Sequence, residues 1–103
     1  MNCQGRKDDA EKPRWDLVPY KAMGKVVDVL TAGAKKYAPE NWRLVPDARP
    51  RYFAAGMRHF TDWWLGKKLD DGPGGTGLPS LACVMCCVLF LLELELEDEE
   101  KAR

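Results

Sequence analysis

The sequence contains a single histidine, His59, and no apolar stretch long enough to cross a membrane. Its longest apolar run, from Leu81 to Leu92, has 12 residues, whereas a membrane-spanning helix needs about 20. We therefore expect a buried helix at this position and no membrane partner. The first residues also lack the apolar segment of a signal peptide, so we expect a cytoplasmic protein with reduced thiols and no disulfides.

Net charge is also absent, because 16 basic and 16 acidic residues balance over the 103 positions. The two signs are nevertheless unevenly distributed. Residues 1–68 contain 14 Lys and Arg against 8 Asp and Glu, and residues 69–103 contain 2 against 8. The basic part is typical of a surface that binds phosphate groups, and the alternative is solvated charge without a ligand. We do not expect a polymeric nucleic acid as a partner.

Strands are not indicated, because apolar and polar residues nowhere alternate with a period of two. Three helices are indicated instead, which predicts an all-α fold. The first has Pro19 in its first turn and apolar residues at helical spacing from Met23 to Tyr37. The second, "RYFAAGMRHFTDWWLG", ends near Gly66 and has one apolar face. The third runs from about Pro79 into the acidic end. The apolar face of the second helix is formed by Phe53, Met57, Phe60 and Trp64.

We expect a small bundle of three main helices that is completed by homo-oligomerisation. The third helix is apolar on every side over residues 81–92, and two other helices are too few to cover it. Small domains often complete their cores by association. A homodimer, or a larger assembly, follows as a hypothesis. We divide the chain into a polar N-terminal segment (1–14), a helical domain (15–97) and a charged tail (98–103).

The segment "GAKKYAPENWR" contains the first candidates for ligand binding. Lys35 and Lys36 could bind phosphates. The alternative is that they only stabilise the C-terminus of the first helix, where cations are favoured. An indole and a guanidinium can stack on a base. Asn41, Trp42 and Arg43, in a proline-rich loop, are therefore candidates for a nucleotide pocket. The alternative for Trp42 is an anchor in the core.

A second group of candidates combines imidazole and carboxylates. His59 and Asp62 lie one helical turn apart, where they could bind a divalent metal or transfer a proton. The alternative is a surface ion pair that includes Arg58. In the glycine-rich turn "LDDGPGGTG", which we expect to be flexible, Asp70 and Asp71 could provide oxygen ligands for Mg²⁺.

Three of the four cysteines share one side of the third helix. Cys83, Cys86 and Cys87 could hold zinc if His59 or Cys3 completed the ligand set. Free cysteine, however, commonly packs like a small apolar residue. Only half of a usual zinc pattern is present, so core filling is the interpretation that we adopt for this cluster.

Taken together, these motifs resemble the phage-associated dATP/dGTP diphosphohydrolase N-terminal family, a relative of the MazG-like all-α nucleoside triphosphate pyrophosphohydrolases. The resemblance covers roughly residues 12–96 and rests on "GAKKY" with "NW", then "RH" followed by "WLG" and Asp70. It implies hydrolysis of a deoxynucleoside triphosphate to the monophosphate and pyrophosphate, with Mg²⁺ or Mn²⁺ on the triphosphate. It further implies a phage or prophage origin and control of nucleotide pools in a bacterial host.

The resemblance also implies roles for the candidate residues. His59 and Asp62 would be catalytic, and Asp70 and Asp71 would hold the metal. The chain departs from the family at Ser80 and Cys83, where histidines are usual, so Cys83 is expected to line the pocket in place of an imidazole. A nucleotide-binding protein without turnover is the alternative function. The substrate-binding candidates are Lys35, Lys36, Tyr37, Asn41, Trp42, Arg43, Arg58 and Cys83.

Overall fold

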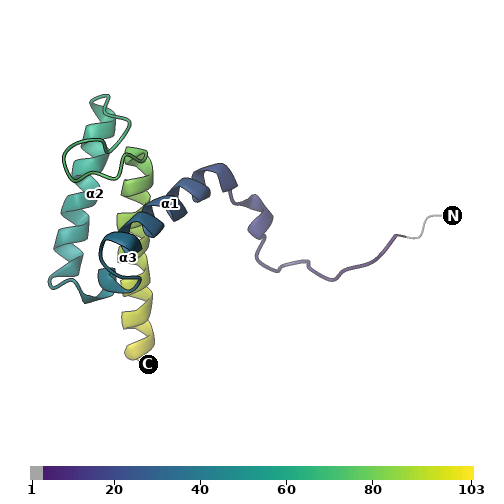
Figure 1. Ribbon diagram of the computed structural model, residues 1–103. Coiled ribbons are helices and arrows are strands. Elements are labelled where there is room, and N and C mark those ends of the chain that lie inside the picture. The colour runs from purple at the N-terminus through teal and green to yellow at the C-terminus, as the bar shows by residue number, and fades with distance from the viewer. Residues whose placement is uncertain (1–3) are drawn as a thin grey trace.

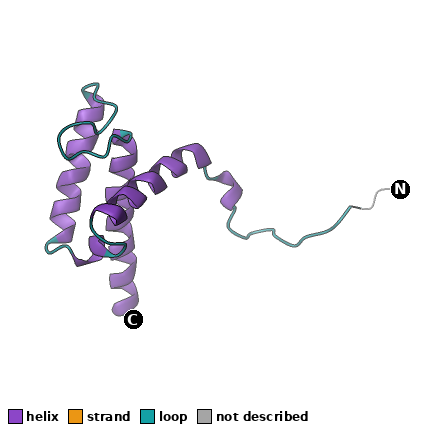
Figure 2. Ribbon diagram, viewed as in Figure 1, coloured by secondary structure: helices purple, strands orange, loops and turns teal. Residues whose placement is uncertain are grey.

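The computed structural model describes residues 4–103, which form three α-helices and two short 3-10 helices (Figure 2). The elements in chain order are η1 (Trp15–Leu17), α1 (Tyr20–Lys36), η2 (Asn41–Leu44), α2 (Ala48–Trp64) and α3 (Ser80–Lys101). No strand occurs in this part of the chain. The predicted all-α class with three main helices is therefore confirmed.

α3 lies at the centre, and both other α-helices pack against it (Figure 1). α2 runs antiparallel beside α3, whereas α1 crosses it. The described part of the N-terminal segment extends away from the helices. Within the described chain, no helix combines the length and the apolar character that a membrane crossing needs.

α1 is held on α3 by apolar contacts. Val26, which is 1% exposed, packs against Ala82 and Cys86. Four partly buried side chains surround this centre, namely Met23, Val29, Leu30 and Phe90. The apolar pattern predicted for α1 is only partly buried, because Val27 and Tyr37 are largely exposed. The core of the chain is consequently small and centred on the first half of α3.

α2 approaches α3 closely because a glycine lies at their contact. Gly56 is buried, and a Cβ atom at this position would lie 3.3 Å from Cβ of Cys87. Next to this contact, the ring of Tyr52 lies 5.1 Å from that of Phe90, and its hydroxyl donates to the carbonyl oxygen of Trp42 at 3.0 Å. These contacts fix η2 to the α2–α3 pair.

The apolar face predicted for α2 points away from the core of the chain. Phe53 is 61% exposed and Trp64 is 78% exposed. Phe53 and Leu91 line one shallow hollow, so this face adjoins α3. On α3 the exposed apolar residues include Met85, Val88 and Leu92. The result is an apolar surface on α2 and α3, and the predicted homo-oligomer that would cover it stays a prediction.

The helix boundaries differ from the predicted ones in three places. Pro19 is the N-cap of α1 and not a residue of its first turn. α2 begins at Ala48, so the end of the predicted proline-rich loop is helical; proline is tolerated here because the first helical turn lacks hydrogen-bond partners for its N–H groups. α3 continues through the acidic end to Lys101. Gly66 follows α2 with a φ of 101°, as predicted for a helix C-terminus.

Candidate functional site

The segment between α2 and α3, residues 65–79, is closed by backbone hydrogen bonds, and we call it the closed loop. The N–H of Ser80 donates to the carbonyl of Lys68 at 2.8 Å, and the N–H of Asp70 donates to that of Leu78 at 2.8 Å. The N–H of Gly77 donates to the carbonyl of Asp70 at 2.7 Å. These hydrogen bonds give the glycine-rich turn a defined path, which its composition does not show, and its flexibility stays a prediction.

The closed loop holds the side chain of Asp70 in place. Thr76 donates its N–H to Oδ2 of Asp70 at 3.1 Å, and its hydroxyl lies 3.3 Å from the same oxygen. The Thr76 hydroxyl also accepts the N–H of Leu78 at 3.1 Å. On its other side it lies 3.9 Å from Sγ of Cys83. Thr76 therefore links the loop carboxylate to the beginning of α3.

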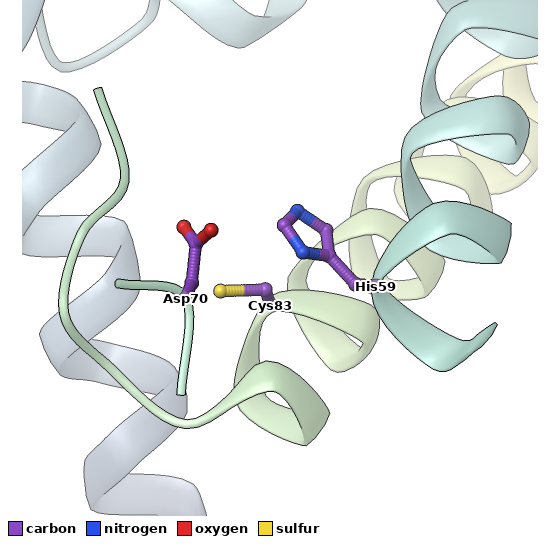
Figure 3. A group of neighbouring side chains, drawn as sticks. All are labelled: His59, Asp70 and Cys83. Atoms are coloured by element: carbon purple, nitrogen blue, oxygen red, sulfur yellow. The ribbon is translucent and has the colours of Figure 1, made fainter. Parts of the chain in front are cut away.

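Three side chains with metal-binding or proton-transfer chemistry meet at this point (Figure 3). His59 comes from α2, Asp70 from the closed loop and Cys83 from α3. One nitrogen, one oxygen and the sulfur of the three residues all lie within 4.8 Å of one another. His59 and Asp70 are half-buried and Cys83 is buried. We call this group the His59 cluster.

Burial governs the chemistry of the α3 thiols. It raises the pKa of Cys86 to about 12 and that of Cys87 to about 11, and the neighbouring Cys83 adds to both effects. Burial also raises the pKa of Cys83, while the hydrogen bond with Thr76 lowers it and the Asp70 charge raises it. All three are therefore neutral thiols near pH 7. Cys86 and Cys87 are buried in the core, whereas Cys83 also faces two polar partners.

A cavity of about 1210 Å³ adjoins the His59 cluster and is bounded by α1, η2, α2, the closed loop and α3. Its charged lining residues are Lys36, Arg51 and Arg58, and no acidic residue of the described chain lines it. Thr76 lines the cavity and also contacts Asp70 and Cys83. The cavity is consequently basic and lies next to the cluster. Its main aromatic and amide side chains are Tyr37, Asn41, Trp42, Tyr52 and Phe90.

The structure brings together five of the predicted substrate-binding residues and leaves three outside the cavity. Lining the cavity are Lys36, Tyr37, Asn41, Trp42 and Arg58. Lys35, Arg43 and Cys83 do not line it. Lys35 is exposed, and Cys83 belongs to the His59 cluster.

Trp42 and Arg43 both have packing roles. The indole of Trp42 stacks on Phe90, with 4.5 Å between ring centroids and 9° between planes. The guanidinium of Arg43 lies 4.4 Å from the centroid of the same indole. Arg43 also forms ion pairs with Glu40 and with Glu97 of α3. The alternative of a packed tryptophan is therefore observed, and Arg43 serves to attach η2 to α3.

The other predicted metal or proton-transfer residues lie outside the cluster. Asp62 is half-buried one turn after His59, and Asp71 is exposed in the loop. Among residues 4–103, no second group of three ligating side chains occurs. No ion pair of this part of the chain includes His59 or Arg58, so the surface ion pair is not observed. Cys3, an alternative zinc ligand, lies outside the described residues.

Sequence reasoning did not identify Arg51, Thr76 or Phe90 as cavity residues. For Arg51 a signal was present, because it lies seven residues before Arg58 and so two turns away on the same face of α2. No local signal was available for Phe90, which lies within the apolar run of α3. Thr76 gains its position only from the closure of the loop.

Comparison with known protein families confirms the resemblance seen in the sequence. The sequence matches the family described as dATP/dGTP diphosphohydrolase, N-terminal, over residues 2–103. No curated protein and no solved structure matches the chain significantly. Because the family match spans nearly the whole sequence, the chain belongs to the dATP/dGTP diphosphohydrolase N-terminal family.

Proposed function

We propose that the cavity binds a deoxynucleoside triphosphate and that the chain hydrolyses it to the monophosphate and pyrophosphate. The observation that carries this proposal is the charge of the cavity, in which Lys36, Arg51 and Arg58 face no acidic lining residue of the described chain. Such a surface attracts an anion with several charges. The family name supports dATP or dGTP as the substrate, and we place the activity in nucleotide-pool control in a phage-infected bacterial cytoplasm.

The cavity suits both ends of a nucleotide. Arg51 and Arg58 lie on α2 and Lys36 ends α1, so two walls supply cations for the phosphates. Guanidinium groups favour phosphate because their N–H donors match its oxygens in pairs. The amide of Asn41 and the rings near it would contact the base. Ligand pockets usually measure roughly 300–1000 Å³, so a cavity of about 1210 Å³ has room for a nucleotide and water.

The proposed reaction needs a group that acts on water. A water oxygen bonds to the α-phosphorus, the bond from that phosphorus to the bridging oxygen of pyrophosphate breaks, and the water proton must be accepted. His59 is the only imidazole of the chain, and Thr76 connects its cluster to the cavity. We therefore assign His59 to the attacking water in the metal-free chain. Asp62, one turn away, would accept the proton when the His59 imidazole is occupied by a metal ion.

Mg²⁺ or Mn²⁺ stays a proposal for the cation that accompanies the triphosphate. Mg²⁺ prefers oxygen ligands in a near-octahedral arrangement. The His59 cluster offers one carboxylate together with nitrogen and sulfur, and Asp71 lies outside it. The described residues therefore do not fit a magnesium ion held by the protein alone. A hard cation would depend on the phosphate oxygens of the substrate.

We also propose that the functional unit is a homodimer. The exposed apolar surface of α2 and α3 would be covered by the same surface of a second copy, because a two-fold interface is self-complementary. Isolated proteins rarely expose a large apolar area. Sedimentation should give twice the chain mass. A Phe60→Asp variant should shift the protein toward the monomer, and a monomer at all concentrations of the unchanged protein would contradict the proposal.

The test of the function is incubation of the pure protein with each common deoxynucleoside triphosphate and Mg²⁺ or Mn²⁺. Chromatography should detect the monophosphate and pyrophosphate in equal amounts. His59→Ala should abolish turnover while circular dichroism shows an unchanged helix content. Lys36→Ala should raise KM, and Lys35→Ala is its matched control, because Lys35 is the adjacent lysine but does not line the cavity. Intact nucleotide with measurable binding would instead identify a nucleotide-binding protein without turnover.

A further inference from the structure

We infer that His59, Asp70 and Cys83 form a binding site for a thiophilic divalent metal ion of the zinc type. The site lies at the junction of α2, α3 and the closed loop (Figure 3). This inference does not depend on the proposed nucleotide hydrolysis, because it concerns metal binding in the absence of any nucleotide.

The geometry requires only a small contraction. Zinc binds nitrogen and oxygen at about 2.0–2.2 Å and sulfur at about 2.3 Å, so ligand atoms of a tetrahedral site lie roughly 3.3–3.6 Å apart. The three ligand atoms lie within 4.8 Å of one another. Rotation of the imidazole and of the carboxylate that moves each ligand atom by up to about one ångström would bring the three atoms to these tetrahedral distances.

The backbone around the three ligands is already fixed. His59 and Cys83 lie within α-helices that pack against each other. Asp70 is fixed by the loop hydrogen bonds, and Thr76 donates to its Oδ2. The second carboxylate oxygen, Oδ1, accepts no hydrogen bond from the described residues. Hydrogen bonds that orient a ligating carboxylate in this way are a regular feature of metal sites.

The combination of ligand types selects the metal. Sulfur and imidazole nitrogen are poor partners for Mg²⁺ and good partners for zinc, and cobalt accepts the same set. Three protein ligands leave a fourth tetrahedral position open, which is the arrangement of catalytic rather than structural zinc sites. Because Thr76 lies between the cluster and the basic cavity, the open position would be next to an anion bound there.

The first experiment is titration of the metal-free full chain with Co²⁺ under reducing conditions. A cobalt–thiolate bond gives a sulfur-to-metal charge-transfer absorption, and tetrahedral coordination gives intense visible bands. We expect both at one Co²⁺ per chain, with displacement by one Zn²⁺. Absence of charge transfer at saturating Co²⁺, or coordination that is octahedral, would overturn the inference.

Matched variants test which residues bind. Cys83→Ala should lose the charge-transfer band. It should also weaken Co²⁺ binding by at least roughly 100-fold, because the loss of a residue that only supports a metal ligand already weakens binding by about 10–100-fold. Cys87→Ala removes another buried thiol of α3 and should keep the band. Cys83→His should bind Co²⁺ without charge transfer, because nitrogen replaces sulfur. A band that survives in Cys83→Ala or disappears in Cys87→Ala would contradict the assignment.

A measurement on the unchanged protein covers the case in which a variant does not fold. X-ray absorption at the zinc edge should show one sulfur with nitrogen and oxygen neighbours. Two or more sulfur neighbours would indicate a site built from several cysteines and would overturn the inference. Failure of nucleotide hydrolysis would leave these results unchanged, since no nucleotide is present.

Discussion

A methyl group added at Gly75 should open the closed loop between α2 and α3. A Cβ atom at this position would lie 2.4 Å from the carbonyl oxygen of Asp70 and 3.0 Å from that of Gly72. Both neighbours are backbone atoms, so a side-chain rotation cannot relieve the overlap. Gly75→Ala should therefore move the chain away from Asp70 and release the carboxylate from the His59 cluster.

The magnitude follows from the hydrogen bonds that the loop would lose. The N–H of Gly75 donates to Gly72 and that of Gly77 donates to Asp70, and each such bond contributes about 1 kcal/mol. The contact between Thr76 and the Asp70 carboxylate adds about 1–2 kcal/mol. Replacing glycine by alanine recovers about 0.4–1 kcal/mol through the unfolded chain. The net loss of unfolding free energy should be about 2.0–3.6 kcal/mol, or roughly 8–29 °C in Tm.

Gly72→Ala provides the matched control in the same loop. Its Cβ atom would meet only the mobile Nζ of Lys67, at 3.5 Å. Urea unfolding followed by circular dichroism should therefore show little change for this variant and a clear loss for Gly75→Ala. Co²⁺ binding should weaken in Gly75→Ala alone. Equal stability and equal Co²⁺ affinity of the two variants would refute the closed loop as the support of Asp70.

Three further predictions concern the contacts between helices. Gly56→Leu should lower the unfolding free energy by about 1–3 kcal/mol in urea titrations, because a larger side chain forces α2 away from Cys87. A double-mutant cycle of Arg43→Ala and Glu97→Ala should give a coupling of about 0.5–1 kcal/mol that decreases with added salt, since this pair is partly exposed. As pH rises from the unfolded thiol pKa of 9.0 toward about 11, Cys86 and Cys87 stay protonated only in the folded chain. Stability should then fall by at most about 1.4 kcal/mol per pH unit for each thiol, and Cys87→Ala should reduce this slope; an unchanged slope would contradict the assigned burial.

The three helices could be predicted because each has a strong local signal, either apolar spacing or a flanking glycine or proline. The loop could not, because its closure depends on hydrogen bonds between residues on both sides of the turn, such as Asp70 and Leu78. The pairing of Arg43 with Glu97 was equally inaccessible, since 54 residues separate them. Sequence alone also gave no indication that Arg43 would be engaged by α3 and so lie outside the cavity.

The His59 cluster shows why the candidate site was predicted only in part. His59 and Asp70 were both identified by their chemistry. Helical spacing grouped Cys83 with Cys86 and Cys87, and only the family resemblance separated it from them as a pocket residue. The observed grouping requires that α2 and α3 run antiparallel and that the loop between them return tightly. Neither condition is encoded in a short motif.

The two departures from the family pattern therefore have different physical consequences. Ser80 is 1% exposed and donates its hydroxyl to the carbonyl of Lys67 at 2.8 Å, so it closes the loop and contributes no ligand to the cluster. Cys83 lies within the cluster, where the family resemblance implies a histidine, and contributes a sulfur atom. The inferred metal site would therefore prefer zinc to hard cations, whereas the basic cavity beside it does not depend on this thiol. We therefore expect the choice of metal and the binding of phosphate to be separable properties of this chain.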